Sequence, residues 1–307
     1  MPKHFLSLAD WPAATLKEWI KQAVWLKREY RAGGNQPVLR GKALAMVFQK
    51  PSLRTRVSFE MAMEHLGGHA LYIGAHEIEM GRRESIPDVV RTLGGYVHGI
   101  VARVQDHADL LQMAEHSPVP VINGLTSYDH PCQAMADVLT MYEEFGRLEG
   151  LRVAYLGDSD NDVTRALLFA AAKFGFQLIV SSPAGHTLAE ETLNRARTLG
   201  GANVVRLIDD PVEAVSDVDV IYTDTWVWFG LEAAEAERRL RIFPPYQVNE
   251  TLLAHARLHA IVLHCMPANR GQEITDSVAD GPRSRLFEQA ENRLHAQKAI
   301  LVRLLGG

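Results

Sequence analysis

The segment Ser52-Leu53-Arg54-Thr55-Arg56 places two hydroxyl groups and two guanidinium groups next to one another. It follows an apolar run, Ala43–Phe48, and opens a helical pattern over Thr55–Leu66. A strand-to-helix turn exposes free backbone N–H groups at the positive end of the helix dipole. Together with the arginines, these groups predict an anion site suited to phosphate. An ordinary helix cap with surface arginines remains an alternative, and no nucleotide-binding glycine motif is present.

A second segment, Asn123–Asp137, runs from a strand end through a loop into a helix and contains His130-Pro131-Cys132-Gln133. Pro131 suits the first turn of a helix, where its missing N–H costs nothing. His130 and Gln133 would then lie at a helix N-terminus, near the edge of a parallel sheet where α/β proteins bind ligands. Each could donate a hydrogen bond to a carbonyl oxygen. A simple capping turn would also explain this pair.

The remaining candidates also follow apolar strands or lie in the last helical pattern. Cys265, in Leu263–Gly271, could be a nucleophile, a polar lining group or an inert buried thiol. Arg103 could supply a second contact to a phosphate or carbonyl oxygen, whereas Arg293 is by itself typical of a solvated helix charge. The turns with carboxylates are Gly157-Asp158-Ser159-Asp160-Asn161-Asp162 and Asp224-Thr225-Trp226-Val227-Trp228-Phe229-Gly230.

These residues divide by charge along the chain. Cations and hydroxyls collect at strand ends of the first half, and carboxylates at strand ends of the second. The first half would therefore hold a doubly charged anion and the second an amine-bearing molecule. Their reaction would take place between two domains.

Short apolar runs alternate with longer helical patterns, which predicts βαβ units and parallel sheets. We expect an α/β protein of two doubly wound parallel-sheet domains joined by helices. The predicted strands are Ala43–Phe48, Ala70–Ile73, Gly99–Val104, Pro120–Asn123, Arg152–Leu156, Gln177–Val180, Asn203–Leu207, Asp219–Tyr222 and Ala260–Leu263. The predicted helices include Thr55–Leu66, Pro87–Tyr96, Cys132–Phe145, Thr164–Phe174 and Glu291–Leu305, and Gly74–Ser85 is expected to be a mobile loop.

Composition excludes several classes of protein. The 307 residues carry a formal charge of −5, which argues against a general nucleic-acid binder. Two cysteines are too few for a disulfide scaffold and agree with a reducing compartment. No signal-peptide pattern and no apolar run of about 18 residues is visible, so we expect no membrane association and a cytoplasmic location.

Three motifs in order resemble the carbamoyltransferases, and their ornithine branch more than the aspartate branch: Ser52-Leu53-Arg54-Thr55-Arg56, His130-Pro131-Cys132-Gln133 and His264-Cys265-Met266-Pro267-Ala268. The resemblance covers nearly the whole chain. It implies a carbamoyl-phosphate-binding domain over residues 1–135, with the C-terminal helix 291–307 packed on it. An amino-substrate domain would cover residues 136–290.

The resemblance also implies an activity, a set of site residues and an assembly. The activity is transfer of the carbamoyl group of carbamoyl phosphate to the side-chain amine of ornithine, which gives citrulline and phosphate without a metal or organic cofactor. Arg103, His130 and Cys265 are the catalytic candidates, although Cys265 suits the lining of the amine pocket better than a covalent role. The carbamoyl-phosphate residues would be Ser52, Leu53, Arg54, Thr55, Arg103, His130, Gln133, Cys265, Met266 and Arg293. The amine residues would be Asn161, Asp162, Asp224, Trp228 and Phe229. A homotrimer would share its active sites through the loop Gly74–Ser85.

The chain departs from the ornithine-branch pattern mainly on the amine side. Trp228 and Phe229 replace a Ser and a Met, Asp162 replaces an Asn, and Glu79 stands where a Gln is usual. These changes leave two alternatives beside ornithine transfer. One is a carbamoyltransferase for another amine or amino acid, and the other is a non-catalytic member that binds an anion. The intact Arg54, Thr55, Arg103, His130 and Gln133 argue against the non-catalytic alternative.

Overall fold

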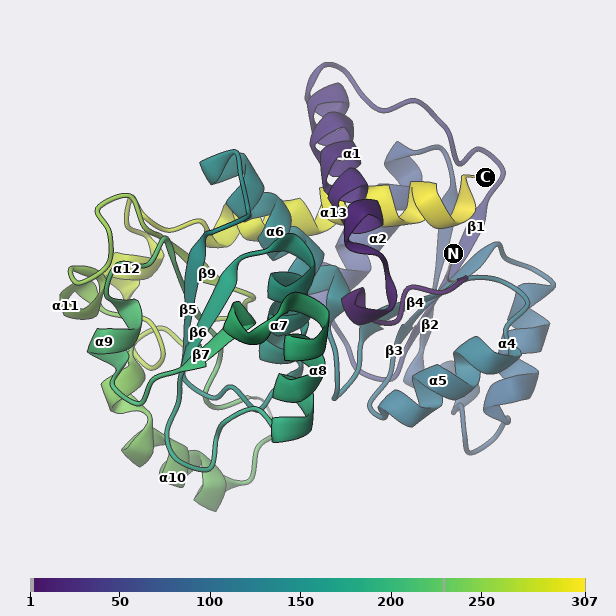
Figure 1. The fold of residues 1–307 in the computed structure, drawn as a ribbon. Coiled ribbons are helices and arrows are strands. Elements are labelled where there is room, and N and C mark those ends of the chain that lie inside the picture. The colour runs from purple at the N-terminus through teal and green to yellow at the C-terminus, as the bar shows by residue number, and fades with distance from the viewer. Residues whose placement is uncertain (1–2, 229, 307) are drawn as a thin grey trace. The chain divides into compact units, whose positions relative to one another are not determined.

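The computed structural model describes residues 3–228 and 230–306, and the chain divides into two compact units. The first unit comprises Met1–Leu139 and Glu291–Gly307, and the second comprises Thr140–Ala290. Both boundaries fall inside helices, namely α6 (Pro131–Phe145) and α13 (Leu286–Leu305) (Figure 1). No helix among the described residues is both long and apolar enough to cross a membrane.

The first unit is built on a four-stranded parallel sheet in the order β2-β1-β3-β4. Its strands are β1 (Ala43–Phe48), β2 (His69–Gly74), β3 (Gly99–Arg103) and β4 (Val121–Leu125). Its helices include α1 (Ala13–Arg31), α2 (Leu53–His65), α3 (Ala75–Ile78), α4 (Ile86–Gly94) and α5 (His107–His116), with the 3-10 turn η1 (Leu8–Asp10) near the N-terminus. Val47 and Ile100 of the sheet pack in one core with Val90 of α4 and Met113 of α5. The strand order reverses between β1 and β3, and open α/β sheets bind ligands beyond the carboxyl ends of strands at such a reversal.

The second unit has a five-stranded parallel sheet in the order β7-β6-β5-β8-β9. Its strands are β5 (Arg152–Leu156), β6 (Gln177–Ser181), β7 (Val205–Leu207), β8 (Val220–Thr223) and β9 (Ile261–His264). Its other elements are α7 (Asp162–Phe174), α8 (Glu190–Gly200), η2 (Ala202–Val204), α9 (Pro211–Val215), α10 (Ala233–Ile242), η3 (Pro244–Tyr246), α11 (Glu250–Leu253) and α12 (Asp276–Ala279). Here the order reverses between β5 and β8, so their carboxyl ends mark the expected ligand edge.

The parallel α/β architecture predicted from the sequence is confirmed, with three local differences. The strand expected to start at Asn203 starts at Val205, because Asn203 and Val204 belong to the 3-10 turn η2. The stretch Gly74–Ser85, expected to be a mobile loop, contains the helix α3, and its Met80 packs in the first core. Helix α13 begins at Leu286 rather than at Glu291, because Leu286 packs in the second core.

Candidate active site

The first candidate turn connects β1 to α2, and Ser52 is the N-cap of that helix. The Ser52 hydroxyl accepts a hydrogen bond from the backbone N–H of Thr55 at 3.3 Å. The two arginines of the motif differ in environment. Arg56 is exposed and lies 4.0 Å over the Tyr72 ring of β2, whereas Arg54 acts electrostatically on His130. The capping alternative therefore describes Ser52 and Arg56 correctly, and Arg54 belongs to a cationic cluster.

The Thr55 hydroxyl is the centre of that cluster. It accepts hydrogen bonds from Arg293 of α13 at 3.0 Å and from Arg103, the last residue of β3, at 3.5 Å. Arg293 also donates to the Gln133 side-chain oxygen of α6 at 2.7 Å. Thr55, Gln133 and Arg293 are each at least 98 % buried. Four elements thus converge within the first unit, and Arg293 is part of a buried network rather than a solvated helix charge.

His130 lies beside this cluster and is almost fully buried. Burial, followed by the charges of Arg293, Arg103 and Arg54, holds the pKa of His130 well below its ordinary value of 6.5. The imidazole is therefore neutral at pH 7. A neutral imidazole has one N–H to donate, which suits a carbonyl oxygen.

The loop before His130 is fixed by its own polar groups. Asn123 donates from its side chain to the Asp129 carbonyl at 3.1 Å, and the Thr126 hydroxyl accepts from the backbone N–H of Asp129 at 3.2 Å. Cys132 donates to the Asn123 carbonyl at 3.2 Å, and burial raises the pKa of its thiol to about 12. Cys132 is consequently a structural thiol.

In the second unit, the turn after β5 is held mainly by Asn161, the N-cap of α7. Its side-chain oxygen accepts from the backbone N–H of Thr164 at 2.7 Å. Its side-chain amide donates to the Asp158 carbonyl at 2.7 Å and to the Tyr155 hydroxyl at 2.9 Å. These three bonds use the oxygen and both amide hydrogens of Asn161 in shaping the turn. Asp162 follows as the first residue of α7.

The segments after β8 and β9 meet at Asp224 and Cys265. The Cys265 thiol donates to the Asp224 carboxylate at 2.9 Å, and the Thr225 hydroxyl donates to the Pro267 carbonyl at 2.8 Å. Between them, Met266 adopts a left-handed backbone conformation with φ of 62°. The negative charge of the neighbouring carboxylate disfavours a thiolate at Cys265. That environment suits a lining residue better than a nucleophile.

Asp224, His264 and Cys265 also have ligand atoms within 4.8 Å of one another. Both ring nitrogens of His264 are already engaged, one by the Met266 backbone N–H at 2.8 Å and the other by Glu273 at 3.1 Å. A metal ion at this cluster would have to displace one of these contacts. The described geometry therefore explains His264 as a residue that holds the 264–269 turn.

Three positions at which the chain departs from the ornithine-branch pattern remain to be placed. Trp228 is 49 % exposed, and the Arg239 guanidinium lies 4.6 Å from its ring centroid. Phe229 lies outside the described residues. In the first unit, Glu79 has a left-handed backbone conformation directly after α3, and it borders a cavity of about 380 Å³ at the end of β1.

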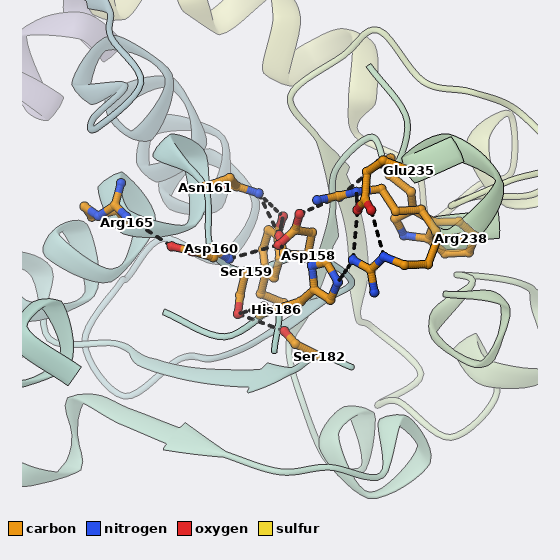
Figure 2. A network of polar contacts seen from close by, with 12 residues as sticks. Asp158, Ser159, Asp160, Asn161, Arg165, Ser182, His186, Glu235 and Arg238 are labelled. Carbon is orange, nitrogen blue, oxygen red and sulfur yellow. Dashed lines mark hydrogen bonds and ion pairs between the residues drawn. The ribbon is translucent and has the colours of Figure 1, made fainter. Parts of the chain in front are cut away.

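No pattern in the sequence points to two residues that contact the turn after β5. Arg239 donates to the Asp158 carboxylate at 2.6 Å. His186 lies 3.6 Å from the same carboxylate (Figure 2). Arg239 belongs to a strongly charged helix that is typical of a solvated surface, and His186 lies in a loop. Only their contacts, made across 81 and 28 positions of sequence respectively, distinguish them.

Comparison with known proteins identifies the chain's relatives. Residues 3–143 match the carbamoyl-P binding domain of the aspartate/ornithine carbamoyltransferases, and residues 149–304 match their Asp/Orn binding domain. The ornithine carbamoyltransferase of Anoxybacillus flavithermus is 48% identical over 306 residues, which cover 99% of this chain and 96% of the relative. The anabolic ornithine carbamoyltransferase of Pyrococcus furiosus is 47% identical over 309 residues, 99% of this chain and 97% of the relative.

Solved structures agree with the sequence relatives. An ornithine carbamoyltransferase structure from Pyrococcus furiosus superposes with a TM-score of 0.95 at 46% identity, covering 99% of this chain and 97% of that one. The structure from Thermus thermophilus gives a TM-score of 0.89 at 42% identity, with 99% of both chains covered. With its two domain matches and its similar full-length relatives, this chain belongs to the aspartate/ornithine carbamoyltransferase family.

Proposed function

We propose that the protein transfers the carbamoyl group of carbamoyl phosphate to the side-chain amine of L-ornithine, forming L-citrulline and phosphate. One observation carries the proposal: the charges of three guanidiniums, those of Arg54, Arg103 and Arg293, act on a neutral, buried histidine that directly precedes α6. Such a cluster suits a ligand with a dianionic end and a polar carbonyl. The names of the most similar relatives support ornithine as the acceptor.

The phosphate end would be held by the first turn of α2 and the arginines. The backbone N–H groups of Ser52, Leu53, Arg54 and Thr55 lie at the positive end of the helix. Arg54, Arg103 and Arg293 supply the balancing charge. Arg293 donates to the Thr55 hydroxyl and to the Gln133 amide oxygen, and these contacts hold its guanidinium beside the first turn of α2.

The carbonyl end would be polarised by Arg103, Thr55 and His130. The unprotonated amine nitrogen attacks the carbamoyl carbon and forms a tetrahedral oxyanion. The bond from carbon to the phosphate oxygen then breaks, and phosphate leaves while the nitrogen loses its proton. Preorganised donors aimed at the oxyanion provide the main rate enhancement, and losing one typically costs about 2.7–4 kcal/mol.

The amine substrate would be held by the second unit. Asp224 would attract its ammonium group before deprotonation, and Cys265 would line the amine pocket. Cys265 and Met266 also belong to the proposed carbamoyl-phosphate set. Asn161 would act through the shape of its turn, since its hydrogen bonds are internal. Asp162, Trp228 and Phe229 complete the proposed amine-binding set.

A different amine is the second candidate acceptor. It is favoured by Trp228, a large ring at a position where the ornithine branch has Ser, and by the negative charge of Asp162. An extra carboxylate would repel an α-carboxylate and attract a second cationic group.

We also propose that the protein is cytoplasmic and that it forms a homotrimer with shared active sites. Leu53, Val57 and Met61 recur at helical spacing on one face of α2 and are 74 %, 46 % and 38 % exposed. Leu71 of the edge strand β2 is 44 % exposed. An exposed apolar stripe of this kind marks an interaction surface, and a second copy would cover it beside the anion-binding turn. Light scattering should give three times the monomer mass, and Val57→Glu should reduce it.

The decisive experiment uses carbamoyl phosphate labelled with ¹⁴C in its carbamoyl group, with a panel of amines that contains ornithine, lysine, putrescine and N-acetylornithine. Labelled citrulline as the main product supports the proposal. Preferred labelling of another amine would overturn ornithine as the substrate, and no labelling of any amine would overturn carbamoyl transfer.

A further inference from the structure

Arg239 of α10 joins the two segments that carry the proposed amine-binding residues. One terminal nitrogen of its guanidinium donates to the Asp158 carboxylate at 2.6 Å and to the Trp226 carbonyl at 3.2 Å. Asp158 belongs to the turn after β5, and Trp226 belongs to the segment after β8. Arg239 and Asp158 are each 7 % exposed. A single buried side chain therefore links both segments.

The guanidinium is held from a third direction by its own helix. The Nε of Arg239 donates to Glu235 at 2.9 Å, and Glu235 also accepts from Arg238 at 2.7 Å. Arg238 in turn donates to His186 at 2.9 Å, and that histidine faces Asp158 (Figure 2). The arginine plane is thus fixed by carboxylates on two sides, which a flexible ammonium group could not reproduce.

Aromatic rings complete the environment of Arg239. Its guanidinium carbon lies 4.6 Å from the Trp228 ring and 5.5 Å from the Phe243 ring, and the Trp226 ring stacks on Phe243 at 5.5 Å. Arg239 therefore contacts the 224–228 segment twice, at the Trp226 backbone and at the Trp228 ring. Asp224 lies only two residues before the first of these contacts.

We propose that Arg239 is a positioning residue for the amine substrate. It fixes the turn after β5 and the segment after β8 in one arrangement, so that groups on both segments can contact the same amine. This inference rests on the proposed function and extends it from the residues that bind the amine to the one that arranges them. A residue that served only the stability of the fold would lower the unfolding midpoint without a selective change in amine affinity.

The test compares Arg239→Lys and Arg239→Gln with the matched control Arg241→Gln, an exposed arginine of the same helix. Arg239→Lys keeps a positive charge for Asp158 but loses the planar fork, so this variant should fold. Its KM for the amine should rise about tenfold or more, with the KM for carbamoyl phosphate within about twofold of wild type. Arg239→Gln should show a larger rise, and Arg241→Gln none.

Equal rises in both KM values, or none in either Arg239 variant, would overturn the positioning role. If wild type and Arg241→Gln turn over no amine, the proposed function fails instead. A second measurement then tests Arg239 by itself, because it needs no substrate. Hydrogen exchange at the backbone amides of residues 225–228 should be about tenfold faster in Arg239→Lys than in wild type. Unchanged exchange there would refute the inference for any substrate.

Discussion

The charged side chains of the two units differ in the kind of partner that they contact. In the first unit, Arg103 and Arg293 donate to the Thr55 hydroxyl, and Arg293 also donates to the Gln133 amide oxygen. In the second unit, Asp158 forms an ion pair with Arg239 in which the two side chains are 10 % and 8 % exposed. These contacts join arginines to neutral oxygens in the first unit and an arginine to a carboxylate in the second.

This difference distinguishes charged residues that suit ligand binding from charged residues that hold the local structure in place. Three guanidiniums that lie near one another raise the local positive potential, as their effect on the pKa of His130 indicates, and an arriving dianion would relieve it. An internally paired carboxylate has little charge left for a ligand and serves to shape its surroundings. By this criterion Asp158 is a structural group, and Asp224, bound by a thiol and a backbone N–H, remains the carboxylate suited to an amine.

The largest expected effect is on the cationic side. Arg54→Ala should lower kcat/KM for carbamoyl phosphate by about a thousandfold, since it removes a charge-assisted contact that strengthens in the transition state. The helix cap at Ser52 stays in place, so the fold should survive. Arg91→Ala, an exposed arginine of α4, is the control and should behave like wild type. Near-normal kinetics for Arg54→Ala would remove it from the site.

A smaller effect is expected for Asp224→Asn. The carboxamide keeps an oxygen for the Cys265 thiol but loses the negative charge, so the KM for the amine should rise about 10- to 100-fold. Carbamoyl phosphate affinity, measured by calorimetry, should stay unchanged. A selective loss of carbamoyl phosphate binding would contradict the division of charge between the two units.

His130 should give a pH effect on stability with a defined sign. Its folded-state pKa lies well below 6.5, so only the unfolded chain takes up a proton there between the two pKa values. Stability should therefore fall as the pH drops below about 6.5, by up to about 1.4 kcal/mol per pH unit for this group. Urea unfolding at pH 5.5 and 7.5 should show a smaller loss in His130→Gln than in wild type. An equal loss in both would mean that the pKa of His130 is not lowered in the folded state.

The smallest effect is expected for Trp228→Ser. The ring is half exposed and stacks on Arg239, and such a cation–π contact is worth about 0.5–1 kcal/mol. The KM for ornithine should therefore change by no more than about fivefold. A gain or loss much larger than this would show that Trp228 selects the acceptor, and would favour the different-amine alternative.

The pattern of apolar residues in the sequence predicts most of the fold. Each end of the nine predicted strands lies within two residues of the corresponding end of β1 to β9. The agreement is close because buried parallel strands form short apolar runs bounded by turns. Helix α1 is absent from the predicted elements, although Leu16, Trp19, Ile20, Ala23 and Leu26 form a buried stripe at helical spacing. That spacing is the signal of the helix in the sequence.

The sequence predicts the candidate site only in part. Arg54, Thr55, His130 and Gln133 lie in local motifs at helix starts, where spacing predicts their direction. Arg293 by itself looked like a surface charge, because its contact with Thr55 spans 238 positions of sequence. Arg239 gave no signal for the same reason. Local pattern cannot report on partners that only the tertiary fold supplies.

The position of Arg293 has a consequence for biosynthesis. The first unit is discontinuous in sequence, and its anion site needs a helix made after the whole of residues 140–290. A nascent chain that has released only residues 1–139 holds Thr55 and Gln133 without their arginine partner from α13. The emerging first unit should thus bind carbamoyl phosphate less tightly until translation has passed α13. Synthesis itself delays completion of the anion site until residues 140–290 have been made.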